Sequence, residues 1–531
     1  MTEASRSDSM RGGGRVAGGH EETLAAALAR ACERWSARIA LRSPDSVLTY
    51  AELADRIRRL STSYERLGIR SGDPVLCQVG NRPEHLIAAA AAWQHGAIHV
   101  ALDRELPLPA LSAAVHRTGA RALVFAPVDD ETCRATAEFV QRDHSDLLIV
   151  LVGAEPLPGT LSFADLATAP DDGTDDSRPE ATDPAAIFTT SGTTGTPKMP
   201  MGYHGKLTRS WSRLAEELHF RPDDVHLGHL PLSHGFGLML ATAALLSGGA
   251  IVPVERFSRA AVLGLIERER ITVFHGSPAH FTMLLGALDE GAHDISSLRI
   301  GVASGAAFDR ALLAAILDRM GMELMLMYGA SEGIGVGTTD RAEMLSGSVG
   351  IPVPGSVGVV DENESPVPEG EVGEIVFARE LSPVRYWQPP ADGTPAGPGP
   401  ELGTGWYHSG DLGRFDAEGR LYVVGRRTDQ INRGGQKVDP REVEEALRGC
   451  PEVAEAAVIG VPHDVLGEVV CACVVPAAGR TCTLDALRSA LAVRLPRYQL
   501  PEELCVLREI PKTTLGKVDP TLLRAAVSAV R

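Results

Sequence analysis

Short apolar runs alternate with longer amphipathic stretches from about residue 22 onward. Runs such as DPVLCQV (73–79) and LLIVLVG (147–153) have the length and apolar continuity of buried strands. Helix signals lie between such runs: Thr49 and Glu52 have the spacing of a capping box, and Asn81 precedes a helical stretch that ends at Gly96. This alternation predicts an α/β fold of layered sheets and helices, with largely parallel strands.

The pattern changes after the segment GRRTDQ (425–430). Asp439 is placed to cap a helix that begins with Pro440. The strand-like and helix-like runs that follow are 453–461 and 468–476 as strands, 483–495 as a helix, and 503–510 as a strand. These runs predict a compact, small α+β domain of its own at the C-terminus.

We therefore expect a disordered tail over residues 1–21, a large N-terminal domain over 22–428 and the small domain over 429–531. The first residues lack the apolar core of a secretory signal. The longest uncharged run, 237–254, approaches the length of a membrane span, but Ser247, Gly248 and Gly249 interrupt it. We expect a buried helix, a turn and a strand there, and no transmembrane segment.

Charge and cysteine content narrow the function classes. The formal net charge of -18 repels phosphate backbones, which argues against nucleic-acid binding. None of the eight cysteines forms a CxxC pair. Reduced thiols are therefore expected in place of zinc or disulfides, which is typical of a cytoplasmic protein.

One loop carries a candidate for chemistry. The stretch TTSGTTGTPK (189–198) has no apolar face, and a strand-like run precedes it. Glycines allow close backbone approach, hydroxyls and N–H groups donate to phosphate oxygens, and a lysine adds a positive charge. The Walker spacing GxxxxGK[ST] is absent, so this is not an ordinary P-loop. The sequence predicts another kind of phosphate-binding loop, against the alternative of a plain polar surface loop.

Further motifs follow this loop in a fixed order. They are LPLSHGFG (230–237), ASGAAF (303–308), MYGASEG (327–333), WYHSGDLG (406–413), GRRTDQINRGGQKV (425–438) and PKTTLGKVD (511–519). Together with the loop they resemble the adenylate-forming superfamily, which holds acyl- and aryl-CoA synthetases, adenylation domains of nonribosomal peptide synthesis and luciferases. The resemblance runs from about residue 22 to the C-terminus and is closest to stand-alone acyl- or aryl-acid ligases.

The resemblance implies an ATP site. Residues matching its phosphate loop are Ser191, Gly192, Thr193, Thr194, Gly195 and Lys198. Residues matching its adenine site are Ser304, Gly305 and Ala306 on one side and Tyr328, Gly329, Ala330 and Ser331 on the other. Glu332 would be the Mg²⁺ ligand, Asp411 would bind the ribose hydroxyls, and Arg426 would support the ribose and α-phosphate.

The resemblance also implies catalytic and moving parts. Lys517 matches the family's catalytic lysine, which bridges the carboxylate and the α-phosphate, and His234 matches a histidine that borders the acyl pocket. Asp429 matches the hinge about which the mobile C-terminal domain rotates between two half-reactions. Gly434 and Gly435 would then line the tunnel for a pantetheine thiol.

The acid itself is constrained by an absence of charge. Residues 225–254 contain no Asp, Glu, Lys or Arg, so an α-ammonium group there would lack a counter-ion. This argues against an α-amino acid. The expected pocket wall is His229, His234, Phe236, Leu238, Phe274, His275, Ser277, Ala303, Gly329, Ala330 and Ile334. Such a lining suggests an aryl or medium acyl acid, including hydroxylated ones.

The resulting hypothesis is an AMP-forming ligase that activates a carboxylic acid with ATP and Mg²⁺ and passes it to CoA. The nearest alternative passes the acid to the phosphopantetheine of a carrier protein. A luciferase-like oxygenase and a catalytically inactive adenylate-binding protein are two further classes. The retained Lys198, Glu332, Asp411, Arg426 and Lys517 argue against the inactive protein.

Overall fold

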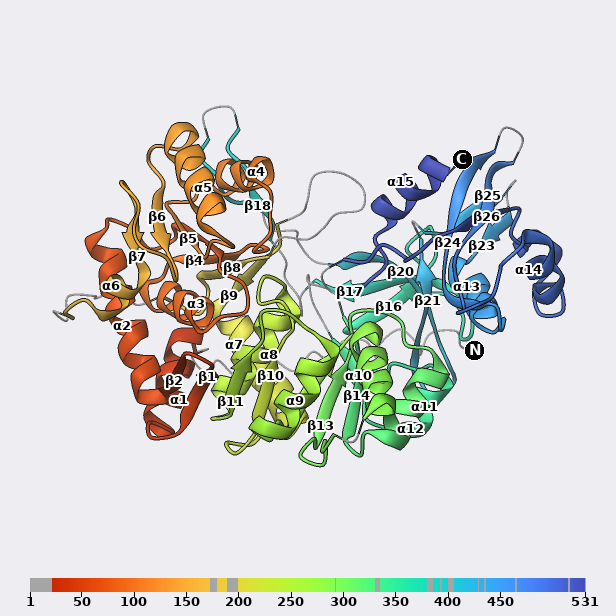
Figure 1. Cartoon of the computed structure of the whole chain (residues 1–531), viewed down its shortest axis with the longest axis horizontal. Coiled ribbons are helices and arrows are strands. Elements are labelled where there is room, and N and C mark those ends of the chain that lie inside the picture. The colour runs from red at the N-terminus through yellow and green to blue at the C-terminus, as the bar shows by residue number, and fades with distance from the viewer. Residues whose placement is uncertain are drawn as a thin grey trace, which may run out of the picture.

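The computed structural model describes residues 22–171, 179–188, 199–291, 293–329, 335–379, 385–391, 394–399, 405–427, 429–433, 436–463, 466–513 and 516–530. Two large sheets with helices between and around them form the N-terminal part, and a smaller α+β unit forms the C-terminal part (Figure 1). The expected α/β architecture is therefore present. The predicted tail, 1–21, lies outside the described residues.

The first sheet has seven strands in the order β7-β6-β5-β3-β4-β8-β9. Its strands are β3 (Pro74–Gln78), β4 (Ile98–Ala101), β5 (Ala122–Phe125), β6 (Leu148–Leu151), β7 (Leu161–Ser162), β8 (Pro184–Ile187) and β9 (Met201–Tyr203). Its helices are α2 (Tyr50–Arg66), α3 (Pro83–His95), α4 (Leu108–Thr118), α5 (Asp130–Asp143) and α6 (Phe163–Thr168). All neighbouring strands except β8 and β9 are parallel, as the alternating pattern predicts.

The second sheet has eight strands in the order β15-β14-β13-β12-β10-β11-β1-β2. Its strands are β1 (Ile39–Ser43), β2 (Ser46–Thr49), β10 (Val225–Gly228), β11 (Ala250–Pro253), β12 (Val273–Gly276), β13 (Ile300–Ala303), β14 (Glu323–Tyr328) and β15 (Val336–Thr338). The central strands run parallel, so their carboxyl ends meet at one edge. Ligand sites form at such edges in α/β sheets.

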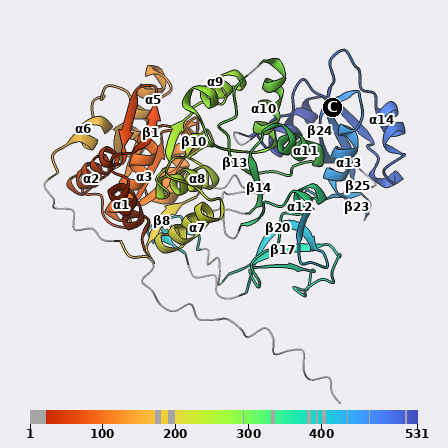
Figure 2. The same cartoon turned by 90° about the horizontal axis from the view of Figure 1, so that it is seen from below.

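Different helices cover the two faces of this sheet (Figure 2). Helices α9 (Arg259–Glu269), α10 (Pro278–Glu290) and α11 (Arg310–Arg319) pack on one face through a core that includes Phe274 and Phe281. Helices α7 (His204–Glu217) and α8 (Gly235–Leu246) pack on the other face, together with Val302 and Met325. Helix α8 also joins α1 (Leu24–Arg34) and α3 in the core between the two sheets.

The uncharged run 237–254 forms most of α8, a turn and β11, as expected. No helix among the described residues combines the length and the hydropathy needed to cross a bilayer. All eight cysteines are free thiols, and all but Cys482 are buried. Buried thiols of this kind pack as small apolar residues.

An antiparallel sheet of β16 (Val357–Val360), β17 (Gly373–Ala378), β20 (Trp406–Phe415) and β21 (Leu421–Arg426) follows the second large sheet. Beyond it, β22 (Ile431–Arg433), β23 (Gln436–Val438), β24 (Val453–His463), β25 (Gly467–Pro476) and β26 (Glu503–Val506) form the sheet of the C-terminal unit. Helices α13 (Pro440–Arg448), α14 (Leu484–Leu491) and α15 (Pro520–Val530) pack on this last sheet. The Asp439 carboxylate accepts a hydrogen bond from the Arg441 N–H, which is the predicted cap of α13.

Candidate active site

Three residues predicted to bind the nucleotide come together although they lie in distant parts of the chain. Tyr328 ends β14, and its hydroxyl donates a hydrogen bond to Asp411 Oδ2 at 2.8 Å. Arg426 ends β21, and its Nε donates to Asp411 Oδ1 at 2.7 Å. Asp411 and Arg426 are direct partners across β20 and β21. A carboxylate has further lone pairs, so Asp411 can still accept hydrogen bonds from two hydroxyls.

The segment before Asp411 is held rigidly by its own hydrogen bonds. Ser409 Oγ donates to the Ile375 carbonyl at 2.6 Å and accepts from the Asp411 N–H at 3.0 Å. The Gly410 N–H donates to the buried Glu374 carboxylate at 3.1 Å, and Gly410 has a φ of 76°, which favours glycine. The motif HSGD therefore fixes where the Asp411 carboxylate points.

Charge within this cluster follows from burial and pairing. Burial and the neighbouring Asp411 raise the pKa of Tyr328, so its phenol stays protonated and donates. Burial alone would lower the pKa of Arg426, but its pairing with Asp411 outweighs this and raises the pKa. The cluster thus presents the Asp411 carboxyl group flanked by two donors, an arrangement that suits a ribose.

Lys517 reaches this site from the C-terminal unit. A Cβ atom placed on Gly305 would lie 4.0 Å from Lys517 Cε and 3.9 Å from Ser277 Cβ. Gly305 has a φ of 91°, so glycine is the favoured residue where the lysine stem passes. Burial and the nearby Arg426 lower the pKa of Lys517, whereas Asp411 raises it. Ser304, Gly305 and Lys517, predicted from separate motifs, therefore share one site.

A tight turn positions Lys517 against the N-terminal part of the chain. The Thr513 N–H donates to the Lys517 carbonyl at 2.7 Å, and the Gly516 N–H donates to the Thr513 carbonyl at 2.8 Å. A Cβ atom on Gly516 would lie only 2.8 Å from Ala279 Cβ, at the start of α10. A side chain at position 516 would therefore push the turn, and Lys517 with it, away from the site.

His234 caps the first turn of α8. Its Nδ1 accepts a hydrogen bond from the Phe236 N–H at 3.2 Å. Burial and the positive charge of Lys517 lower the pKa of His234 to about 4. The imidazole is therefore neutral near pH 7 and carries its proton on Nε2. His234 therefore lies close enough to Lys517 to sense its charge, and offers a neutral donor there.

The expected wall of the acyl pocket does not form one surface. The rings of His229 and Phe274 stack at 4.9 Å between centroids, on the face of the sheet covered by α9 and α10. Phe236 packs on the opposite face, with α7 and α8. The expected wall is therefore divided between two faces, because strand side chains alternate between them.

Two contributors to the site region were missed from the sequence. His280 Nδ1 lies 2.9 Å from Ser277 Oγ and closes the first turn of α10 beside the Lys517 turn. His226 lies on the same face of the sheet as His275, and their ring centroids are 6.1 Å apart. Reading HGSPAH (275–280) as a strand end with a capping box, and counting alternate positions along the strands, would have indicated both.

Several predicted residues lie outside the described residues. They are Ser191, Gly192, Thr193, Thr194, Gly195 and Lys198 of the phosphate loop, Ala330, Ser331, Glu332 and Ile334 after β14, and Gly434 and Gly435 after β22. Ala306 and Gly329 are described, in the loops that follow β13 and β14. The predicted adenine-binding loops therefore begin at adjacent strands of one sheet.

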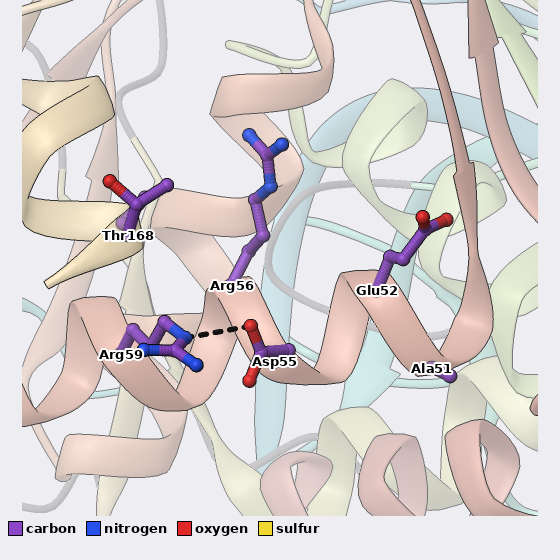
Figure 3. A pocket seen from close by; sticks show the side chains of 7 residues that line it. Ala51, Glu52, Asp55, Arg56, Arg59 and Thr168 are labelled. Carbon is purple, nitrogen blue, oxygen red and sulfur yellow. Dashed lines mark hydrogen bonds and ion pairs between the residues drawn. The ribbon is translucent and has the colours of Figure 1, made fainter. Parts of the chain in front are cut away.

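A separate depression lies on the outer surface between α2 and α6 (Figure 3). Asp55 and Arg59 form a hydrogen-bonded ion pair of 2.7 Å in its wall. These helices lie at the end of the molecule opposite to the C-terminal unit (Figure 1). The depression is therefore no part of the site around Asp411 and Lys517.

The chain matches known proteins over nearly its whole length. Residues 28–387 match the AMP-binding enzyme family, and residues 442–517 match the AMP-binding enzyme C-terminal domain. A feruloyl-CoA synthase from an Amycolatopsis species is 35% identical over 484 residues, which cover 90% of this chain and 94% of the relative. An indoleacetate–CoA ligase from Aromatoleum aromaticum is 32% identical over 501 residues, covering 92% and 95% respectively.

A solved structure agrees with both matches. ATP-bound MatB from Rhodopseudomonas palustris is 25% identical and superposes with a TM-score of 0.81, covering 96% of this chain and 100% of that chain. The expected fold, with a large N-terminal and a smaller C-terminal domain, is confirmed. The chain therefore belongs to the family of AMP-binding enzymes, as an AMP-forming acid–thiol ligase of the acyl- and aryl-CoA synthetase type.

Proposed function

We propose that the enzyme activates an aryl or medium acyl acid, not an α-amino acid, and that Lys517 acts in the first of two half-reactions. A carboxylate oxygen of the acid bonds to the α-phosphorus of ATP as the bond to pyrophosphate breaks. The thiol sulfur of CoA then bonds to the acyl carbon as the bond to AMP breaks, and the thiol loses its proton. The observation that carries this proposal is the position of Lys517, which lies beside Gly305 and near Asp411 and Arg426.

The first half-reaction brings two anions together, so the site must supply positive charge and preorganised donors. Lys517 bridges the carboxylate and the α-phosphate, with His234 Nε2 as a neutral donor nearby. Asp411 holds the ribose, Tyr328 stacks on the adenine, and Arg426 faces the α-phosphate. These roles come from the motif positions and fit the described geometry.

The phosphate loop and the metal ligand complete the proposed ATP site. Ser191, Thr193, Thr194 and Lys198 bind the β- and γ-phosphates, with Gly192 and Gly195 allowing their approach. Glu332 would hold Mg²⁺, a hard cation that suits a carboxylate and phosphate oxygens.

We place the enzyme in the cytoplasm, where ATP and CoA are available.

The acid pocket is assigned to the face of the second sheet that carries α8. Phe236, Met239 and Met327 pack on that face and stay only half-buried. Partly exposed apolar side chains beside a catalytic lysine suit the body of an aryl or aliphatic acid. The relatives named for feruloyl-CoA and indoleacetate also point to aryl acids.

Domain rotation serves the second half-reaction. The proposed hinge is Asp429, between a large domain over 22–428 and a small domain over 429–531. Rotation withdraws Lys517 and brings the hairpin with Gly434 and Gly435 toward the pantetheine arm. A carrier-protein phosphopantetheine would use the same tunnel, so it remains the alternative acceptor.

The test is one incubation of the enzyme with ATP, Mg²⁺, CoA and a panel of aryl, short, medium and long acyl acids, read by mass spectrometry. We expect AMP and an acyl-CoA from aryl or medium acyl acids. Acyl adenylate that accumulates without thioester would favour the carrier protein as acceptor. Absence of AMP with every acid would refute the proposal.

A further inference from the structure

Two buried imidazoles lie behind the half-buried apolar face of the proposed acid pocket. His226 in β10 and His275 in β12 are each only 3% exposed. Their ring centroids are 6.1 Å apart, and the Phe220 ring lies 4.6 Å from one and 6.0 Å from the other. We call His226 and His275 the imidazole pair.

None of the four ring nitrogens in the imidazole pair has a hydrogen-bond partner among the residues that the structure describes. A buried polar group without a partner lowers the stability of the folded protein. Valine, leucine or phenylalanine would fill the same places without this loss. A polar group that reached the pair from outside the protein would remove the loss.

The imidazole pair adjoins the apolar cluster that includes Phe236 and Met327. The Phe220 ring lies beside both imidazoles and belongs to this cluster, in which Phe236 and Met327 are half-buried. His226 pairs with Val273 across β10 and β12, so His275 lies two residues nearer the carboxyl edge of the sheet, where the Gly276 carbonyl accepts a hydrogen bond from the Ser304 N–H at 3.0 Å. His226 lies deeper, where a Cβ atom on Gly249 would come within 3.0 Å of its Nε2. His275 is therefore the member of the pair nearer the edge where Gly305 and Lys517 lie.

The chemistry of the pair selects a neutral partner. Burial lowers the pKa of His226 to about 4 and lowers that of His275 well below its usual value. Asp224 and Arg299 are the charged groups that act on His226, and they oppose each other. Each neutral imidazole offers one donor and one acceptor, which match a hydroxyl group. A second carboxylate or an ammonium group would be buried without a counter-ion.

We infer that the imidazole pair recognises a hydroxyl group on the acid, at the end remote from the carboxylate, with His275 in contact and His226 behind it. The substrate class is then a hydroxylated aryl acid. This inference rests on the proposed function, because it uses the same acid pocket. It assigns a specificity role and no catalytic role to the two histidines.

The test compares a ring-hydroxylated aryl acid with the same acid lacking the hydroxyl, as kcat/KM ratios. The wild type is expected to prefer the hydroxylated acid by at least about tenfold, since a site with buried polar groups rejects the analogue that leaves them unpaired. His275→Phe is expected to reduce this preference by about tenfold to a hundredfold, largely by losing activity on the hydroxylated acid. His275→Gln keeps a donor and should retain part of the preference.

A matched control is His99→Phe. His99 in β4 is 1% exposed and also lacks partners on both ring nitrogens among the described residues, but it lies in the other large sheet. Its replacement should leave the preference unchanged. An unchanged preference in both His275 variants, or a wild-type preference for the acid without a hydroxyl, would overturn the inference and leave the proposed function standing. Absence of AMP with every acid would refute both.

Discussion

Buried neutral histidines are the most unusual residue-scale property of this enzyme. His85, His99, His226, His229 and His275 are almost fully buried. Burial lowers the pKa of each, to about 4 for His85 and His226 and to about 3 for His229. A histidine in the unfolded chain has an ordinary pKa of about 6.5. The folded protein therefore keeps these imidazoles neutral at pH values where the unfolded chain binds protons.

This difference predicts acid sensitivity. Between about pH 6.5 and pH 4 the unfolded state binds more protons than the folded state, so the free energy of unfolding falls as pH falls. Each such histidine contributes a slope of about 1.4 kcal/mol per pH unit within that window. Urea unfolding at pH 7.5, 6.5, 5.5 and 5.0 should show little change above pH 7 and a steep loss below pH 6.5.

The double variant His85→Gln, His99→Gln is the control for this slope. It removes one buried imidazole from α3 and one from β4, so its stability should fall less steeply with acid. The difference in proton binding between the unfolded and the folded state should decrease by up to about two protons per molecule. A wild-type stability that stays constant from pH 7.5 to pH 5 would show that the histidines are protonated in the folded protein.

Residue pairing in the site was only partly predictable. Tyr328, Asp411 and Arg426 were each placed at the nucleotide by a separate motif, and they do meet. The hydrogen bond from Tyr328 to Asp411 joins positions far apart in the chain and depends on the irregular register of β20. Sequence spacing gives no measure of such a contact, because it arises only when two sheets pack together.

At the scale of elements, strong local signals located most of the fold. The capping box of Thr49 and Glu52 begins α2, and Asp439 caps α13. The antiparallel sheet that carries Asp411 was not predicted, because only one strand face is buried over parts of β20 and β21 and glycines interrupt both. The predicted strand 503–510 ends at Val506, and the predicted helix 483–495 ends at Leu491, before Pro496.

The connection between β21 and β22 is the element on which the proposed domain rotation would depend. The Asp429 N–H donates to the Arg426 carbonyl at 3.2 Å, directly beside the Asp411 cluster. Asp429→Pro removes this donor and fixes φ near −65°. We expect adenylate formation within a few fold of wild type and thioester synthesis reduced at least about tenfold, because the hinge is locked.

Asp429→Ala is the matched control, because it removes the carboxylate but keeps the N–H and the backbone freedom. It should support both half-reactions. Measuring pyrophosphate release and acyl-CoA formation separately distinguishes the outcomes. Thioester synthesis at the wild-type rate in Asp429→Pro would remove Asp429 as the hinge.

At the scale of the whole molecule, the candidate active site is assembled from three parts of the chain. The second large sheet supplies Ser304, Gly305 and Tyr328, and the antiparallel sheet supplies Asp411 and Arg426. The C-terminal unit supplies Lys517 through a turn that packs on α10. This arrangement fits the proposed first half-reaction, in which Lys517 would face both the carboxylate and the α-phosphate.

The account therefore depends on Lys517 serving adenylation and leaving the site before thioester formation. Lys517→Ala removes one key positive group from a preorganised site, which typically costs about 10²–10³ in rate. Lys512→Ala is the matched control: Lys512 lies on the same turn, but it is exposed and forms an ion pair with Glu455 at 2.6 Å. Exposed ion pairs contribute little to the stability of the folded protein, so both half-reaction rates of this variant should resemble those of the wild type.

The most direct measurement is the single-turnover rate of each half-reaction in Lys517→Ala, Lys512→Ala and the wild type. Adenylate formation is followed from acid and ATP, and thioester formation is followed from a supplied acyl adenylate and CoA. The account predicts a loss of about 10²–10³ in the first rate and a much smaller change in the second, for Lys517→Ala alone. Equal loss in both half-reactions, or no loss in adenylate formation, would contradict it.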